Sequence, residues 1–263
     1  MAKSSGLGSK FFVSGYDISG DAGAITRIGC PMPVLDVTGI DSPGGRERVQ
    51  GPADGEISFN VWFNDASGQE HDVLKAKGAV EYLLASIGGA QGNPAAMLVG
   101  LQLNYDWTRN QDGSLQGTVQ ALSKGNISGT ITDYGLEWGT DIIGGTDTLT
   151  SPAGAGDQTV GEVTAQSTAG AAIQLQVISL ASGTPTFIIQ DSSDTTTGSD
   201  GSWATLKTAT IQAANTAERL TVAGTVEKGL RVSGTGTYTN AVIACGVRRG
   251  TSRDRVAYTG AQS

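Results

Sequence analysis

The sequence contains few of the side chains on which most enzymatic chemistry depends. Among 263 residues there is one histidine, His71, and there are two cysteines, Cys30 and Cys245. A Ser-His-Asp site or a zinc site would need several such groups close together. Neither a G-x-S-x-G nor a G-x-x-x-x-G-K-[ST] motif occurs. His71 stands between two acidic residues and is interpreted as a solvated surface residue. We therefore predict that the protein is not an enzyme and has no catalytic residues, cofactor or metal.

Charged and aromatic side chains are also scarce, whereas glycine is abundant. Charged residues make up 16% of the chain and aromatic residues 6%, and there are 39 glycines, which suits many tight turns. The net charge is −8, and residues 1–143 carry nine basic and sixteen acidic side chains, a net of −7. An acidic surface of this kind does not grip phosphate groups, although nucleic acid can slide past it.

Long apolar runs and disulfide-forming pairs are missing as well. No apolar stretch approaches the length of a membrane span, and the first residues, Met-Ala-Lys-Ser-Ser, contain no apolar core of a secretory signal. Two cysteines, one in each half, are too few for a disulfide-stapled scaffold, so we expect two free thiols. We predict a protein without a membrane span that is made in a reducing compartment.

Three segments of the first half alternate between apolar and polar residues, as strands do. They are Glu56–Phe63, Leu101–Trp107 and Leu115–Leu122, and an Asp-Gly pair at 112–113 predicts a hairpin turn between the last two. The pattern predicts a mostly-β fold with apolar side chains inside and neutral or polar side chains outside. The predicted outer face consists of Ser58, Asn60, Gln102, Asn104, Asp106, Gln116, Thr118 and Gln120.

One helix and one long loop interrupt these strands. After Ser67, which has the spacing of a capping box with Glu70, apolar residues recur at helical spacing as far as Ile87, and Gly88-Gly89 ends the pattern. Residues 38–55 form a long polar segment that carries Arg46, Glu47 and Arg48. Long loops in compact domains are usually functional or disordered, so we expect these three side chains to contact a neighbour.

Composition divides the chain into four parts. Residues 1–143 are predicted as a first, mostly-β domain with one helix. Residues 144–159 are rich in Gly, Ser, Thr and Pro and are predicted as a linker. Residues 160–249 contain several short strands separated by turns, which predicts a small β-sandwich. Residues 250–263 are predicted as a flexible tail.

Several segments resemble the major tail protein, or tail tube subunit, of long non-contractile-tailed (siphovirus-type) phages, especially those of actinobacterial hosts. They include GYDISGDAGAITRI at 15–28, GPADGEISFNVWFND at 51–65 and GLEWGT at 135–140. The most specific is NPAAMLVGLQLNYDWTRNQDGSLQGTVQALSKG at 93–125. Residues 160–249 are more loosely similar to a β-sandwich appended to some of these proteins.

The resemblance implies that residues 1–143 form a β-sandwich or barrel flanked by one helix, with an extended loop. It also implies a structural role. It implies hexameric rings that stack into a tube. The genomic DNA would leave the capsid through this tube without binding specifically to its wall. The predicted polar face would line the lumen, and Arg46, Glu47 and Arg48 would contact the next ring. The second domain would project outward on its Gly-rich tether, with weak contact to host-surface glycans. The protein would be made in the host cytoplasm, join other phage tail proteins and reside in the virion.

Two other readings of the residues stay open at this point. A capsid decoration protein, or another virion structural protein, would also be β-rich, acidic and non-enzymatic. A carbohydrate-binding module would account for the second half, although the chain has few aromatic residues for a sugar-binding face.

Overall fold

The computed structural model describes residues 7–39, 44–50, 54–76, 80–123, 135–150, 166–193 and 203–251. It is mostly β, with 61% strand and 3% helix, which confirms the predicted fold class. Within these ranges no helix is long and apolar enough to cross a membrane. Residues 151–159 of the predicted linker and 252–263 of the predicted tail lie outside the described residues.

The elements follow one another as many short strands and a few long ones. The helix is α1 (Glu70–Leu74). The strands are β1 (Lys10–Val13), β2 (Tyr16–Asp17), β3 (Ala22–Gly29), β4 (Val34–Asp36), β5 (Arg48–Gln50), β6 (Glu56–Trp62), β7 (Val80–Ser86), β8 (Pro94–Arg109), β9 (Leu115–Ser123), β10 (Leu136–Asp141), β11 (Asp147–Leu149), β12 (Ala171–Gly183), β13 (Thr186–Ser192), β14 (Ala204–Thr208), β15 (Thr216–Val222), β16 (Gly229–Thr235) and β17 (Tyr238–Arg249).

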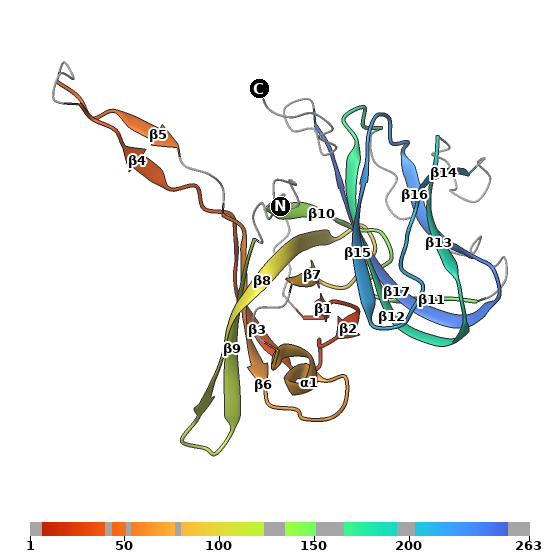
Figure 1. The fold of residues 1–263 in the computed structure, drawn as a ribbon, viewed down its shortest axis with the longest axis horizontal. Coiled ribbons are helices and arrows are strands. Elements are labelled where there is room, and N and C mark those ends of the chain that lie inside the picture. Colours follow the sequence, from red (N-terminus) through yellow and green to blue (C-terminus); the bar gives the residue numbers. More distant parts are fainter. Residues whose placement is uncertain are drawn as a thin grey trace.

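Strand β8 is the longest and belongs to two walls of one sheet. Its first half pairs with β7 on one side and β10 on the other, whereas residues 100–109 pair with β9. Strand β9 continues to β6, and β6 continues to β3. Phe11 of β1 meets Phe59 of β6 with ring centroids 4.5 Å apart, so the two walls enclose a shared core. Figure 1 shows β8 running through the middle of this half of the molecule.

The predicted helix is wrong beyond its first turn. Helix α1 ends at Leu74, and Val80–Ser86 form strand β7 instead. Strand β7 lies between β1 and β8, with Leu83 in one hydrophobic core and Leu84 in another, so both of its faces are covered. A strand buried on both faces has a continuous apolar run that spacing alone does not separate from a helix. The predicted cap at Ser67 is also wrong, because no side chain makes a capping bond.

The second half is built on the far end of the same large sheet. Strands β12, β15 and β17 belong to that sheet, and β13, β14 and β16 form a separate three-stranded sheet. The two layers enclose a core that includes Leu175, Phe187 and Ile243, each with no exposed surface.

Strand pairing also joins the two halves. Residues 140–141 of β10 pair with residues 246–247 of β17, and β11, which lies within the predicted linker, also pairs with β17. Arg219 of the second half donates two hydrogen bonds, of 2.7 and 2.8 Å, to Glu137 of β10. The first residues of the predicted linker are therefore part of the fold, while the division into two domains stays a prediction.

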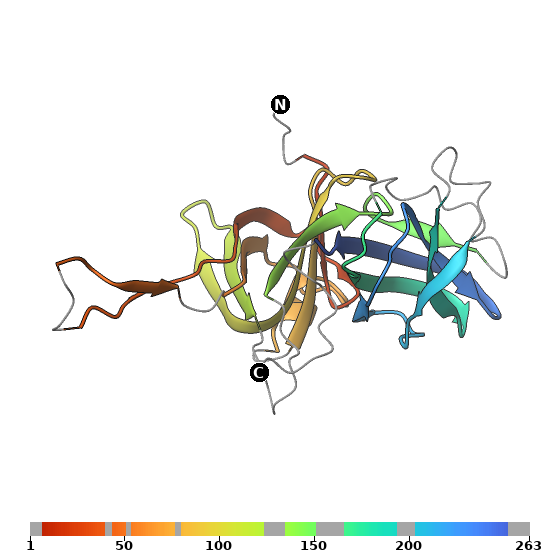
Figure 2. The ribbon, with the colours of Figure 1, turned by 90° about the horizontal axis from the view of Figure 1, so that it is seen from above.

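Strand β5, which lies in the predicted polar loop, and strand β4, which precedes that loop, form a two-stranded arm. Strands β4 and β5 pair with each other as a separate antiparallel sheet. In both Figure 1 and Figure 2 this arm points away from the rest of the molecule, on the side opposite the second half.

Candidate assembly surfaces

One face of the sheet formed by β3, β6, β9 and the outer half of β8 is lined by polar side chains. Seven of the eight residues predicted for this face lie on it, because the pairing register aligns them across neighbouring strands. The register places them in three rows: Ser58–Gln120–Asn104, Asn60–Thr118–Asp106 and Trp62–Gln116–Thr108. We call this surface the polar face, although its third row includes the apolar side chain of Trp62, which is 43% exposed.

The prediction is wrong at Gln102, because β8 contains a bulge. Gln102 pairs with Ala121 and Asn104 pairs with Gln120, which leaves Leu103 as an extra residue. One extra residue moves the preceding side chains to the opposite face. Gln102 is consequently only 2% exposed, and its amide donates a 2.7 Å hydrogen bond to the Leu74 carbonyl. Leu103 is 45% exposed.

One end of the polar face carries an ion pair between Arg27 and Glu56, which the sequence pattern did not predict. Glu56 accepts hydrogen bonds from Ser58 at 2.6 Å and from Gln120 at 2.9 Å, and Arg27 lies 3.0 Å from it. The hydrogen bond from Ser58 is the main cause that lowers the pKa of Glu56, so its carboxylate stays charged and balances Arg27. The strand pattern alone gave no signal that Arg27 of β3 would lie beside this row.

A cluster of titratable side chains lies behind the polar face and secures α1. His71 Nδ1 lies 2.8 Å from the Tyr105 hydroxyl, and the His71 side chain is partly buried. The prediction that His71 is a solvated surface residue is therefore wrong. Glu70 has no exposed surface, and burial raises its pKa. Burial also raises the pKa of Tyr105. Among the described residues no group of three His, Cys, Asp or Glu side chains is placed to hold a metal ion. The contact between His71 and Tyr105 joins α1 to β8.

The sheet behind the polar face has two strand edges that carry no partner strand within the described ranges. Strand β3 pairs with β6 alone, and residues 104–109 of β8 pair with β9 alone. Unpaired edges present backbone donors and acceptors to any strand of matching direction. The two edges lie at opposite sides of the sheet and differ in sequence.

The arm has one apolar face and one charged face. Leu35 lies opposite Val49, and Val37, two residues along from Leu35, shares their face. These three side chains are 51%, 52% and 50% exposed, respectively. On the other face Asp36 lies opposite Arg48. The sequence prediction identified Arg46, Glu47 and Arg48 as contacts but missed the apolar residues.

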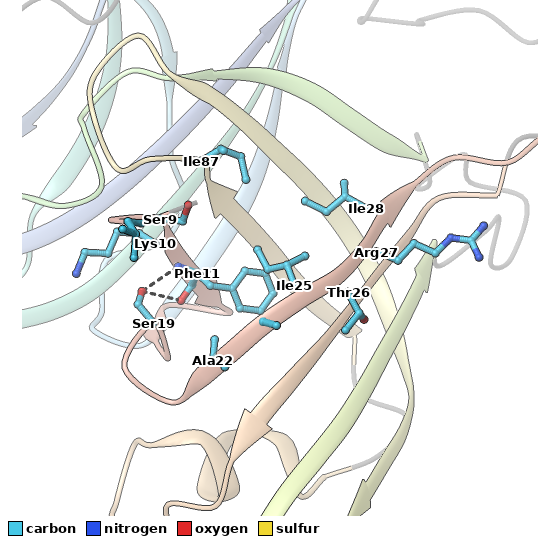
Figure 3. A pocket seen from close by; sticks show the side chains of 13 residues that line it. Ser9, Lys10, Phe11, Ser19, Ala22, Ile25, Thr26, Arg27, Ile28 and Ile87 are labelled. Carbon is cyan, nitrogen blue, oxygen red and sulfur yellow. Dashed lines mark hydrogen bonds between the residues drawn. The ribbon is translucent and has the colours of Figure 1, made fainter. Parts of the chain in front are cut away.

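A pocket of about 620 Å³ opens beside the free edge of β3. Figure 3 shows Phe11 beside Ile25, with Ile28 and Ile87 farther along the same opening. Leu7 also lines it and is 86% exposed. The lining of this pocket, which we call the seam pocket, contains two cations, Lys10 and Arg27. Both are paired with carboxylates outside the lining, since Lys10 lies 4.0 Å from Asp17 and Arg27 lies 3.0 Å from Glu56.

The sequence matches no family model and no curated protein. Among solved structures, a chain in the virion of a native gene transfer agent particle is 19% identical, with a TM-score of 0.36 over 47% of this chain and 96% of that chain. A chain in the tail of an empty gene transfer agent particle with C6 symmetry is 23% identical, with a TM-score of 0.31 over 42% and 82%.

The Dit protein of phage SPP1, described as a hub adsorption apparatus paradigm, is 12% identical, with a TM-score of 0.32 over 91% of this chain and 99% of that chain.

Proposed function

We propose that this protein is the structural subunit of a phage tail tube, in which hexameric rings stack around a channel that conducts DNA. The observation that best supports this role is a four-stranded sheet with one polar face and two free edges. A ring built from identical copies in head-to-tail order needs two different, complementary surfaces on each copy. The two sheet edges supply such surfaces through backbone hydrogen bonds.

In the proposed ring, β3 of one copy pairs with residues 104–109 of β8 in the next copy. Repeating this contact closes the sheets into one barrel, which removes the exposed edges. Every polar face then lies on the same side of the barrel wall. We assign that side to the channel, because the opposite side of each sheet is occupied by the subunit's own core.

The chemistry of the polar face suits a channel for DNA. Asn60, Thr118 and Gln120 are neutral, Asp106 is acidic, and the cation Arg27 is balanced by Glu56. A wall without uncompensated cations does not hold phosphate groups, so DNA passes without specific binding. Acidic residues also outnumber basic ones by seven in residues 1–143.

The second half is proposed to face outward. It lies at the far end of the large sheet from β3, on the opposite side from the arm (Figure 2). In a virion assembled in the host cytoplasm with other tail proteins, many copies of this half would be displayed, so weak contacts to host-surface glycans would add through avidity.

Electron microscopy of the purified full chain over a range of concentrations tests the proposal. We expect six-fold rings, or striated tubes with a central channel, in which copies join through β3 and β8. If the chain stays monomeric, it is added separately to isolated tails and to isolated heads. Extension of tails supports the proposal, whereas coating of heads supports a capsid decoration protein, and binding to a glycan array with neither supports a carbohydrate-binding module.

A further inference from the structure

A polar pocket lies where the two halves of the molecule meet. Its volume is about 390 Å³, which is within the size range of small-molecule sites. Strand β2 and the start of α1 form one wall, and β12 together with the turn before β15 forms the other. We call it the junction pocket, and its lining includes Tyr16, Asp17, Gln69, Asp72, Ile178 and Asn215.

Contacts between the halves hold the two walls of the junction pocket in place. Gln176 of β12 has no exposed surface, and its amide accepts a 2.5 Å hydrogen bond from the Gly15 backbone and donates a 2.8 Å bond to the Tyr82 carbonyl. A Cβ at Gly15 would lie 2.3 Å from the Thr216 nitrogen, so the turn before β2 touches the start of β15. The pocket is therefore formed before a ligand binds, which lowers the entropic cost of binding.

Two amide side chains of the pocket have no hydrogen-bond partner within the part of the chain that the structure describes. Gln69 precedes α1 and makes no capping bond, and Asn215 precedes β15. Each amide offers one carbonyl acceptor and two N–H donors. Because the two amides come from opposite walls, together they can hold a ligand that both donates and accepts hydrogen bonds.

The charges around the pocket favour a neutral ligand. Its lining contains two carboxylates, Asp17 and Asp72, and no cation among the described residues. Each carboxylate has a lysine partner outside the lining, since Lys10 lies 4.0 Å from Asp17 and Lys75 lies 2.5 Å from Asp72. An acidic group would face these carboxylates without a compensating cation, and a basic group would compete with the lysines. Hydroxyl groups, in contrast, can donate to the carboxylates as they stand.

An aromatic ring and an aliphatic side chain complete the lining. The Tyr16 ring packs against Gly68, where an added Cβ would lie 3.7 Å from it, and Ile178 lines the pocket from the second half. A sugar ring matches this combination, because it carries hydroxyl groups around its rim and C–H groups on its faces. The C–H groups pack on apolar and aromatic surfaces, while the hydroxyl groups bond to amides and carboxylates.

We propose that the junction pocket binds one neutral saccharide unit, whose hydroxyl groups bond to the amides of Gln69 and Asn215. This rests on the proposed function for the source of the ligand, a host-surface glycan, and it places the glycan contact at the junction of the halves. A single small site binds weakly, and the many copies in a tube add through avidity.

Saturation-transfer difference NMR on the purified full chain tests the proposal. The neutral probes are the methyl glycosides of glucose, galactose, mannose and N-acetylglucosamine, and the acidic probe is methyl glucuronide. We expect at least one neutral probe to receive saturation at millimolar concentration. Methyl glucuronide should receive several-fold less, because its carboxylate meets the acidic lining.

Matched side-chain deletions identify the site. Gln69→Ala removes one amide, and Asn215→Gly removes the other while keeping a residue that suits the φ of 56° at this position. We expect each to weaken binding about tenfold, as the loss of a hydrogen-bonding side chain predicts. Gln212→Ala is the control, because Gln212 is exposed and does not line the pocket. Thermal unfolding checks that the variants fold alike.

Three results would overturn the saccharide site. They are the absence of saturation in every neutral probe, a signal from methyl glucuronide as strong as that of the best neutral probe, and equal affinities of Gln69→Ala and Gln212→Ala. Beads that carry the best neutral probe test the source of the ligand. We expect assembled protein to be retained on them and released by the free sugar, and binding of the free sugar without retention would overturn the assignment to a surface glycan.

The same preparations separate this inference from the tail-tube proposal. Rings or tubes that bind no neutral probe would remove the saccharide site and leave the tail-tube role standing. A chain that forms no rings and extends no tails, but binds a neutral probe with the expected effect of Gln69→Ala, would keep the site and remove the tail-tube role.

Discussion

At the residue scale, one inserted side chain decides which amides reach the polar face. Leu103 is extra relative to β9, so Gln102 turns inward and bonds to the Leu74 carbonyl that ends α1. The alternation of the sequence through residues 101–107 looks regular, and a bulge leaves no mark on such a pattern. The other seven polar positions could be predicted because the strands around them keep an unbroken register.

The buried carboxyl of Glu70 predicts a pH dependence of stability. Its pKa is raised above 4.5 by burial, so between the unfolded and folded pKa values the folded state binds more protons than the unfolded state. The contribution of Glu70 to stability is therefore full at low pH and is lost as the pH rises through the folded pKa. We expect Glu70→Gln to gain stability relative to the native chain between pH 4 and pH 7.5, measured by urea unfolding.

The exposed carboxylate of Asp112 provides a control, because its pKa is shifted in the opposite direction. Hydrogen bonds from Ser114 lower the pKa of Asp112, so its contribution is present above its unfolded pKa and is lost as the pH falls. Asp112→Asn should therefore be less stable than the native chain by a nearly constant amount over the same range, and this difference should shrink only as the pH falls below 3.8. Identical pH dependence in both variants would contradict the role assigned to burial at Glu70.

At the element scale, strand pairing connects the two halves. The glycine-rich composition of residues 144–159 predicted a tether, yet its first residues continue into β11. Long-range pairing of β10 with β17 joins residues about a hundred positions apart, and local composition carries no information about it. The type of element was predictable where apolar and polar residues alternated, as in β6 and β9. The prediction failed at β7, where both faces of the strand are buried.

The close approach of β10 and β17 predicts that the junction tolerates no added methyl group. A Cβ at Gly139 would lie 2.3 Å from the Val247 carbonyl oxygen, so the two strands would have to separate. We expect Gly139→Ala to lower the free energy of unfolding by about 1–3 kcal/mol. Chemical denaturation measures this, with Gly20→Ala as the control, since a methyl group there meets no atom within 4 Å. Equal stability of the two variants would contradict a tight junction.

At the scale of the whole molecule, the class of structure was easier to predict than its assembly surfaces. Scarce charge, abundant glycine and alternating strands indicated a mostly-β protein, and the structure confirms it. The apolar face of the arm was not predicted, because its residues are separated in sequence and become neighbours only when Leu35 pairs with Val49. The seam pocket likewise forms only when β1 and β3 approach one another.

The proposed channel predicts that added positive charge slows DNA rather than disturbing assembly. Thr118 is exposed at the centre of the polar face, so Thr118→Arg would place a ring of cations in the lumen. We expect virions built with this variant to form normal tails and to release DNA several-fold more slowly, with a stronger salt dependence. Release is followed by fluorescence of a DNA-binding dye.

Thr205→Arg is the matched control, because Thr205 is exposed on β14 in the second half. It should leave the rate of DNA release unchanged. Slowing by Thr205→Arg alone would place the second half, and not the polar face, beside the DNA.

Strand β8 gives the molecule a mechanical property. It is 16 residues long, about 50 Å at 3.3 Å per residue, and its two ends belong to different walls. Its first residues pair with β10, which is held to the second half by β17, and its last residues belong to the polar face. In the proposed tube, a force applied to the second half would therefore be carried along one covalent strand to the wall of the channel. The outside of the tube and its channel would then be mechanically coupled through this strand.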